Sequence, residues 1–199
     1  TKVDHRSAAP ADVVSSTEDS LRRLGMDHVD LLLIHWPTDE VPVEDTVGAL
    51  DEVRERGWTR LIGVSNYPSR LVHRAAKVAP VAVNQVEYHP FLGQEAVLAA
   101  CREHDMLLTA YSPLAHGRVL GDDTLARIGK AHDVGPAQIA LRWLLDQSDV
   151  LAIPRSGNRE HIEQNAQLDF TLSDDQRAEI DALPKDRRVL DPPFAPDWD

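Results

Sequence analysis

The amino-acid sequence predicts an α/β protein whose parallel strands form a (β/α)8 TIM barrel, incomplete in these 199 residues. Three observations support this prediction: aliphatic runs of strand length, helical patterns between them, and polar residues directly after the runs. Strands covered by helices on both faces of the sheet show such continuous apolar runs, whereas strands with one exposed face alternate apolar and polar residues. A barrel of this kind carries its functional groups at the carboxyl ends of its strands.

Five complete strands are expected, at residues 29–34, 60–64, 81–86, 107–111 and 150–153. Residues 1–3 are interpreted as the end of one more strand. A complete (β/α)8 barrel has eight strands and about 250 residues. Residues 1–199 are therefore expected to form a single barrel domain that lacks its N-terminal part and holds about strands 3–8.

Helices are expected between and around the strands, at residues 11–24, 44–56, 94–104, 122–132, 136–147 and 174–182. Gly25 and Gly57 follow the first two segments, as is typical of the residue after a helix. Pro136 suits the first helical position of its segment, and Ser173 with Gln176 matches a capping box. The alternation of strands and helices indicates a parallel sheet.

Polar residues follow five consecutive strands, which favours a barrel over the other common architecture with a parallel sheet. These residues are His35, Ser65-Asn66, Gln85, Tyr111-Ser112 and Arg155-Ser156. A doubly wound nucleotide-binding fold would show a Gly-x-Gly-x-x-Gly turn after an early strand. The sequence contains no such turn, so the barrel is the favoured fold.

The composition argues against several classes of function. The net charge of −12 disfavours nucleic acid and anionic membranes as partners. No apolar run reaches the length of about 18 residues that a membrane span needs. The single Cys101 excludes an internal disulfide and zinc sites of the paired-cysteine type. The scattered histidines also lack metal-ligand spacing, so we expect no metal. Because the sequence indicates neither a disulfide nor a membrane span, we expect a cytoplasmic protein.

The basic residues are unusual because only four of the 21 are lysines. Acid-rich, lysine-poor surfaces suit a salt-loaded cytoplasm, in which screening suppresses the repulsion between like charges. We therefore expect a halophilic source with an acidic proteome; a GC-rich genome alone would also explain the excess of arginine. The stability is expected to rise in molar salt. Thermal unfolding at several salt concentrations measures this, and an unchanged midpoint contradicts it.

Several motifs together resemble the aldo-keto reductase family. They are Leu24-Gly25, Val29-Asp30-Leu31-Leu32, His35-Trp36-Pro37, Gly63-Val64-Ser65-Asn66, Asn84-Gln85-Val86-Glu87-Tyr88-His89-Pro90, Tyr111-Ser112-Pro113-Leu114 and Ile153-Pro154-Arg155-Ser156 with Asn165. The compact loops and the ending Ala195-Pro196-Asp197-Trp198-Asp199 resemble the microbial 2,5-diketo-D-gluconate reductase-like group. The resemblance implies a (β/α)8 barrel that uses NADPH to reduce an aldehyde or ketone to the alcohol.

The resemblance also implies catalytic roles for two residues. His35 matches the histidine that orients and polarises the substrate carbonyl, whose oxygen gains negative charge during hydride transfer. Lys2 matches the lysine that lowers the pKa of a proton-donating tyrosine. Trp36, Tyr88 and His89 match positions at the edge of the substrate site. The expected partner is a small carbonyl substrate, and neither a nucleic acid, a membrane nor a metal is expected.

The cofactor-binding residues implied by the resemblance are Ser65, Asn66, Gln85, Tyr111, Ser112, Leu114, Arg155, Ser156, His161, Gln164 and Asn165. Tyr111 matches the ring that stacks on the nicotinamide, and the residues from 65 to 85 match those that bind its carboxamide. The residues from 155 to 165 match the segment around the 2′-phosphate and adenine. Arg155 stands where the family commonly has lysine, and His161 where it commonly has arginine. NADPH is therefore expected as cofactor, with NADH possible.

The proton-donating tyrosine of the family and its paired aspartate match no residue of this chain, whose tyrosines are Tyr67, Tyr88 and Tyr111. Negligible carbonyl reduction is therefore expected from residues 1–199 alone. An alternative is a non-catalytic nucleotide-binding remnant or accessory subunit of the same fold. A serine hydrolase at Gly63-Val64-Ser65 is disfavoured, because Tyr67 stands where the nucleophile motif needs glycine. We expect a monomer at full length and self-association of the open fragment.

Overall fold

The computed structural model describes residues 1–199 and contains one six-stranded sheet. Its strands are hydrogen-bonded in chain order: β1 (Lys2–Val3), β2 (Val29–Ile34), β3 (Thr59–Ser65), β4 (Val81–Glu87), β5 (Leu107–Tyr111) and β6 (Val150–Ala152). The pairs β1–β2, β2–β3 and β3–β4 are parallel. The sheet stays open, with β1 and β6 as its edges, as expected for a barrel that lacks strands.

Eight α-helices accompany the strands: α1 (Pro10–Leu24), α2 (Val43–Glu55), α3 (Ser69–Ala76), α4 (Glu95–Glu103), α5 (Asp123–Ala131), α6 (Pro136–Leu145), α7 (Arg159–Ala166) and α8 (Asp174–Asp181). Two 3-10 segments lie at His5–Ser7 and Ala115–Gly121. None of the helices is both long and apolar enough to cross a membrane. The chain divides into two compact units, which we describe separately.

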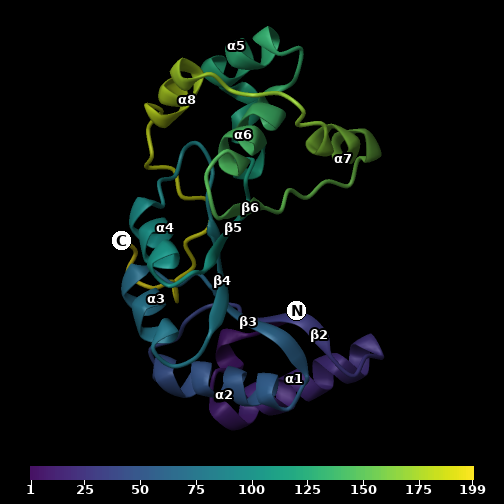
Figure 1. Ribbon diagram of the computed structural model, residues 1–199, viewed down its shortest axis with the longest axis vertical. Helices are drawn as coiled ribbons and strands as arrows, with labels where there is room; N and C mark the ends of the chain where they lie inside the picture. The colour runs from purple at the N-terminus through teal and green to yellow at the C-terminus, as the bar shows by residue number, and fades with distance from the viewer. The chain divides into compact units, whose positions relative to one another are not determined.

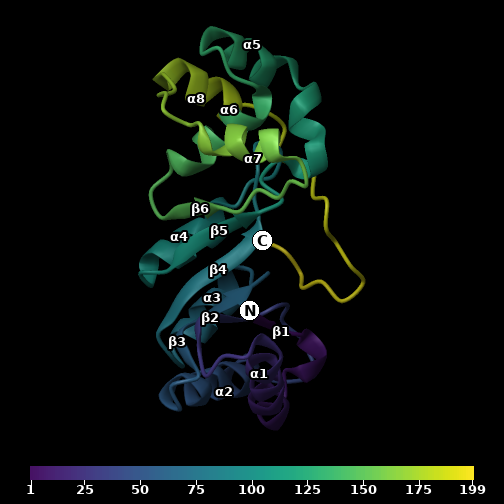
Figure 2. The same ribbon diagram turned by 90° about the vertical axis from the view of Figure 1, so that its right-hand side faces the viewer.

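The first unit comprises Thr1–Val86, Glu95–Leu108 and Pro192–Asp199. Helices α1 and α2 lie side by side in it (Figures 1 and 2), and α3 packs on α4. The sheet and the helices bury their aliphatic side chains against one another, with Leu32 and Ile34 on β2 and Leu50 and Val53 on α2 fully buried. Burial of this kind is the main favourable term in folding.

Gly63 on β3 allows the closest approach between neighbouring strands in this unit. It lies opposite Leu33 of β2 and Val83 of β4, at a shift in the register between β3 and β4. A Cβ atom added there would meet Leu33 Cδ2 at 2.5 Å and the carbonyl oxygen of Val83 at 2.9 Å. The position therefore has no room for a side chain.

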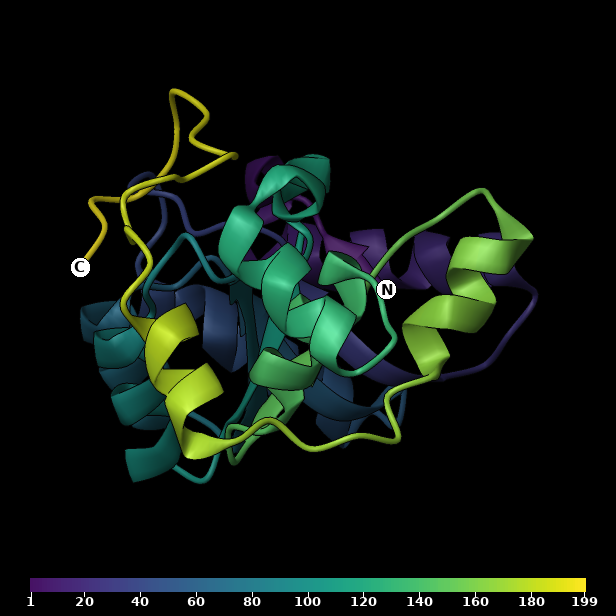
Figure 3. The same cartoon turned by 90° about the horizontal axis from the view of Figure 1, so that it is seen from above.

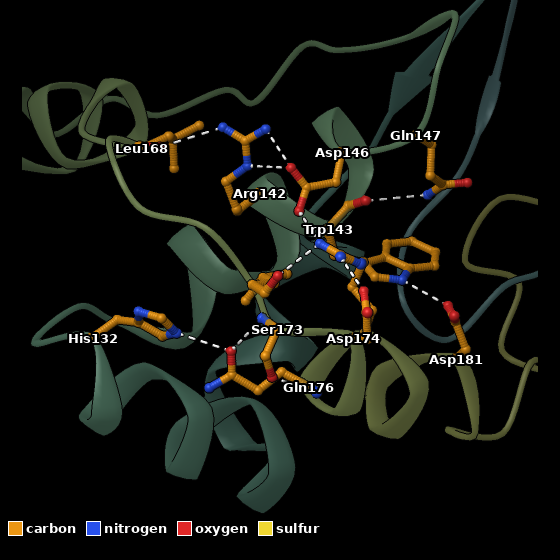
Figure 4. Close-up of polar contacts among 12 residues, drawn as sticks. His132, Arg142, Trp143, Asp146, Gln147, Leu168, Ser173, Asp174, Gln176 and Asp181 are labelled. Carbon is orange, nitrogen blue, oxygen red and sulfur yellow. Dashed lines mark hydrogen bonds and ion pairs between the residues drawn. The ribbon is translucent and has the colours of Figure 1, made fainter.

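The second unit comprises Glu87–Gln94 and Thr109–Asp191. Helix α6 packs on α5 and α7, and α5 also packs on α8 (Figure 3). Polar side chains join α6 to α8 (Figure 4): the indole Nε1 of Trp143 donates to Asp181 at 2.8 Å, and Asp146 accepts from Arg142 at 2.7 Å and from Arg177 at 3.4 Å. These contacts satisfy polar groups at the border of an apolar helix interface.

The elements agree closely with the sequence prediction. All five complete strands and the end of a sixth are confirmed, as are the six predicted helices, with ends that differ by one or two residues. The capping box of Ser173 and Gln176 is present at α8. Two helices were missed, α3 and α7. Helix α3 is only eight residues long, and α7 buries no residue, so neither carries a long amphipathic pattern.

Candidate active site

The predicted site residues fall into two groups, one in each unit. Those of the first unit are Lys2, His35, Trp36, Ser65, Asn66 and Gln85. Those of the second unit are Tyr88, His89, Tyr111, Ser112, Leu114, Arg155, Ser156, His161, Gln164 and Asn165. Most of the first group lies at or just after the carboxyl end of a strand, because parallel strands end at one edge of the sheet.

His35 follows β2 directly, and its backbone N–H donates to the carbonyl oxygen of Val3 at 2.9 Å. The side chain is exposed, so a small molecule can reach it. Burial of the ring's inner part and the positive charge of Lys2 lower the pKa of His35 below its ordinary value. The imidazole is therefore neutral at neutral pH and can donate a hydrogen bond from one ring nitrogen. Partial burial likewise lowers the pKa of Lys2.

Ser65, Asn66 and Gln85 form a connected polar group beside His35. The Ser65 hydroxyl donates to the backbone carbonyl oxygen of Gln85 at 2.7 Å, and the Asn66 backbone N–H donates to the same oxygen at 2.9 Å. The Asn66 side chain donates to the His35 carbonyl at 3.0 Å and to the Ser65 hydroxyl at 3.1 Å. Asn66 has a φ of +63°, a left-handed conformation that asparagine tolerates better than most residues.

Trp36 is buried and packs on aromatic residues of the segment Pro192–Asp199. The Phe194 ring meets Trp36 edge-on at 5.6 Å and stacks on His5 at 4.2 Å, and the Trp198 ring lies 6.0 Å from Trp36. Such edge and stacked contacts are favourable beyond the area they bury. The end of the chain is thereby held beside the residue that follows His35.

Eight of the predicted residues of the second unit line two surface cavities. The first, of about 470 Å³, is lined by Tyr111, Ser112, Leu114 and Arg155 among others. The second, of about 170 Å³, is lined by a set that includes Leu114, Arg155, Ser156, His161, Gln164 and Asn165. Leu114 and Arg155 border both cavities, so the two adjoin. An aromatic ring, hydroxyls, amides and a guanidinium along one surface are the groups that a phosphorylated dinucleotide requires.

The residues after Tyr111 and the first part of the 3-10 segment Ala115–Gly121 are held in an uncommon backbone conformation. Ser112, Ala115 and His116 have φ values of 47°, 47° and 53°, and Gly117 follows at 90°. Left-handed conformations at residues other than glycine and asparagine cost free energy and cluster at ligand sites. This stretch borders the larger cavity, which is consistent with a binding role.

Tyr88 and His89, predicted at the substrate edge, have buried side chains with partners inside the second unit. The Tyr88 hydroxyl donates to Gln147 Oε1 at 2.6 Å, and its ring lies edge-on to Trp143. His89 Nδ1 accepts from the Phe91 N–H at 3.2 Å, so the proton sits on Nε2, which lies 3.0 Å from Glu87 Oε1. This geometry supports a packing role for both.

Glu87 is the residue near the site that sequence reasoning missed. Its carboxylate is fully buried and accepts from His89 and from the backbone N–H groups of Val189 at 2.6 Å and Leu190 at 2.8 Å. Burial alone would raise the pKa of Glu87, but these hydrogen bonds together hold it below its ordinary value. An acidic residue at the carboxyl end of β4, next to the Tyr88-His89 pair, was the available signal.

The surroundings of the three tyrosines differ in burial and in hydrogen-bond partners. Tyr67 is fully buried, and this burial raises the pKa of its hydroxyl. Burial and, secondarily, the Glu87 carboxylate raise the pKa of Tyr111 as well. The Tyr88 hydroxyl is bound to Gln147. A lowered tyrosine pKa, which proton donation near neutral pH favours, is thus not found at Tyr67 or Tyr111.

The fold and these residues define a class of protein. The profile of the Aldo/keto reductase family matches residues 1–185, and the chain belongs to that family. Methylglyoxal reductase DkgB of Escherichia coli O157:H7 is 38% identical over 210 residues, which cover all of this chain and 77% of that protein. Glyoxal reductase of Bacillus subtilis is 40% identical over 179 residues, which cover 88% of this chain and 64% of that protein.

Solved structures of relatives agree with the family assignment. The crystal structure of a putative 2,5-diketo-D-gluconic acid reductase B has a TM-score of 0.97 and 41% identity, over all of this chain and 73% of that chain. The Bombyx mori aldo-keto reductase AKR2E4 in complex with NADP has a TM-score of 0.88 and 31% identity, over 96% of this chain and 69% of that chain. The predicted family and the incomplete barrel fold are therefore confirmed.

Proposed function

We propose that residues 1–199 supply the carbonyl-polarising and dinucleotide-binding parts of an NADPH-dependent reductase that converts an aldehyde or ketone to the alcohol. The observation that carries the proposal is the pair of adjoining cavities lined by Tyr111, Ser112, Leu114, Arg155, Ser156, His161, Gln164 and Asn165. Relatives named for methylglyoxal and glyoxal support a small carbonyl compound as substrate.

In the first unit, we assign polarisation of the carbonyl to His35. Its neutral imidazole donates a hydrogen bond to the carbonyl oxygen, where charge develops as hydride arrives. Bound NADPH supplies that hydride. Ser65, Asn66 and Gln85 would hold the carboxamide of the nicotinamide, and Trp36 would border the substrate. Partial burial and, secondarily, the positive charge of Lys2 on the neighbouring strand lower the pKa of His35 and favour its neutral form.

In the second unit, we assign stacking on the face of the nicotinamide ring to Tyr111. We assign binding of the adenosine 2′-phosphate to Arg155 and Ser156. Arg155 is exposed and permanently charged, and a guanidinium can bind two phosphate oxygens at once. His161 is a weaker phosphate ligand than arginine because an imidazole offers fewer hydrogen-bond donors than a guanidinium. The proposed cofactor is therefore NADPH, with NADH accepted at lower affinity.

An alternative function is nucleotide binding without catalysis, as in an accessory subunit. The burial of Tyr67, the tyrosine in the unit of His35, and the bound hydroxyl of Tyr88 favour this alternative for residues 1–199. The two functions share the dinucleotide site and differ in turnover. Measurement of binding and turnover on the same sample separates them.

Titration of NADPH fluorescence against the 199-residue chain tests the binding site. Arg155→Gln is expected to weaken NADPH binding by about ten- to a hundredfold, because a charge-assisted hydrogen bond is lost. NADH binding is expected to weaken much less. Arg127→Gln is the matched control, because this exposed arginine pairs with Glu179 and lies outside both cavities and outside residues 155–165. Equal loss for both nucleotides contradicts the assignment of Arg155.

Oxidation of NADPH in the presence of methylglyoxal measures turnover by the same chain. Negligible turnover is expected because Tyr67 is buried, the Tyr88 hydroxyl is bound to Gln147, and Tyr111 is assigned to the nicotinamide ring. Turnover at a rate usual for enzymes, about 1 s⁻¹ or more, would show that another group donates the proton and would overturn this part of the proposal.

A further inference from the structure

Two histidines that lie 31 residues apart in the sequence meet on the outer surface of the first unit. His73 belongs to α3, and His104 directly follows the last residue of α4. Their ring nitrogens, His73 Nδ1 and His104 Nε2, are 2.9 Å apart, and the rings meet at 76°. Both side chains are half-buried. At this distance one ring nitrogen donates a hydrogen bond to the other.

A third possible ligand completes the group. One oxygen of the exposed Glu103 carboxylate and one nitrogen of each histidine all lie within 4.8 Å of one another. Two imidazole nitrogens with one carboxylate oxygen form the protein ligand set of many zinc sites that leave a fourth position for water. A surface cavity of about 340 Å³, also lined by Ala76, Ala79 and Ala82, borders His104 and gives solvent access.

The local backbone holds these side chains in place. Helices α3 and α4 pack together through buried residues, among them Val72 and Cys101. Shortly after α4, Asp105 has a left-handed backbone conformation with a φ of 55°. The backbone N–H groups of His104 and Met106 both donate to the Cys101 carbonyl. This tight ending fixes the direction in which His104 leaves the helix.

The nearby positive charge of Arg74 is neutralised by another partner. Arg74 follows His73 on α3, and its guanidinium makes two hydrogen bonds to Glu44, at 2.9 Å and 2.7 Å. This bidentate contact directs the guanidinium toward α2 and lowers the cost of a further cation. The electrostatic surroundings of the histidines therefore do not oppose a divalent ion.

We propose that His73, His104 and Glu103 bind a zinc-class divalent cation that links α3 to α4. In a tetrahedral site with zinc–nitrogen bonds of about 2.0–2.1 Å, the two nitrogens lie about 3.3 Å apart. The rings thus need to separate by only a few tenths of an ångström, and the exposed Glu103 side chain can turn toward the ion. This proposal replaces the expectation, drawn from sequence spacing, that the histidines form no metal site.

Binding of Zn²⁺ to the metal-free 199-residue chain, in competition with a chromophoric chelator, tests the site. One ion per chain is expected, with a rise in the thermal unfolding midpoint, because a ligand that binds only the folded state stabilises it. His73→Gln and His104→Gln are each expected to weaken Zn²⁺ by about tenfold or more, since one nitrogen ligand is lost. Mg²⁺ is expected to have no effect, because it prefers oxygen ligands.

The control is His28→Gln, which removes a histidine that pairs with Asp27 outside the cluster and is expected to leave Zn²⁺ affinity unchanged. If a histidine variant fails to fold, Glu103→Ala at an exposed position and NMR of the wild-type histidine rings provide independent tests. Zn²⁺ should shift the ring signals of His73 and His104 and spare His28. Absence of stoichiometric binding, or wild-type affinity in both glutamine variants, overturns the proposal.

Discussion

Replacement of Gly63 by alanine is expected to lower the free energy of unfolding by about 3 kcal/mol, the upper end of the usual cost of overpacking. The added Cβ would lie 2.5 Å from Leu33 Cδ2 and 2.6 Å from Val83 Cγ1. These side chains can move only at the expense of a packed core. The third contact, the Val83 carbonyl oxygen at 2.9 Å, is backbone and moves only if the pairing of β3 with β4 is disturbed.

Urea denaturation of the 199-residue chain measures this effect. Gly48→Ala is the matched control, because Gly48 lies inside α2 with no atom within 4 Å of an added Cβ. That substitution is expected to stabilise the chain by about 0.4–1 kcal/mol, since alanine restricts the unfolded chain and favours helix. A Gly63→Ala protein that unfolds at the wild-type urea concentration would mean that β3 can shift freely. Ser65 and Asn66 would then lack a rigid support.

Removal of the Glu87 carboxylate is expected to have the second large effect. Glu87→Ala leaves His89 and the N–H groups of Val189 and Leu190 without their acceptor. Each unsatisfied polar group costs about 1–3 kcal/mol, so the expected loss of unfolding free energy is about 3 kcal/mol or more. Faster hydrogen exchange at the amides of residues 189 and 190 is expected to accompany the lower urea midpoint.

The control for Glu87 is Glu18→Gln, an exposed position on α1, where a change within about 0.5 kcal/mol is expected. Unchanged exchange at residues 189 and 190 in the Glu87→Ala protein would show that other contacts hold this segment. The bridge between Leu92 and Asp186 and the bond from the Arg187 N–H to the Phe91 carbonyl are the candidates.

The pH dependence of stability gives a separate test of Glu87. Its pKa is lower in the folded chain than the ordinary value of 4.5. The unfolded state therefore binds the proton more readily, so this stabilisation is complete above pH 4.5 and is lost as the pH falls toward the folded-state pKa. The difference in urea midpoint between wild type and Glu87→Gln is expected to shrink between about pH 5 and pH 3.

Local sequence patterns predict most of the fold because the strands are rich in valine, leucine and isoleucine. Leu31-Leu32-Leu33-Ile34 is one example, and the polar residue that follows it, His35, marks the functional edge of the sheet. The same argument places Ser65, Gln85 and Tyr111. In each case a few neighbouring residues predict the strand. The tendency of functional groups to lie at the carboxyl ends of parallel strands then predicts the site residue.

The features that the sequence does not predict are contacts between distant residues. The carboxylate of Glu87 binds backbone groups more than 100 residues away, and backbone groups have no sequence signature. His73 and His104 come together only because α3 packs on α4. Helix α3 itself was missed, so no spacing argument could have paired the two histidines.

The backbone at Asn66 restricts which amino acids this position can use. The residue needs a left-handed conformation, and its side-chain amide must also donate to both the His35 carbonyl and the Ser65 hydroxyl. Glycine accepts the conformation but has no donor, and aspartate has the right shape but carries only acceptors. Asparagine meets both demands. The internal geometry of the strand ends is therefore enough to require asparagine here, independently of the substrate.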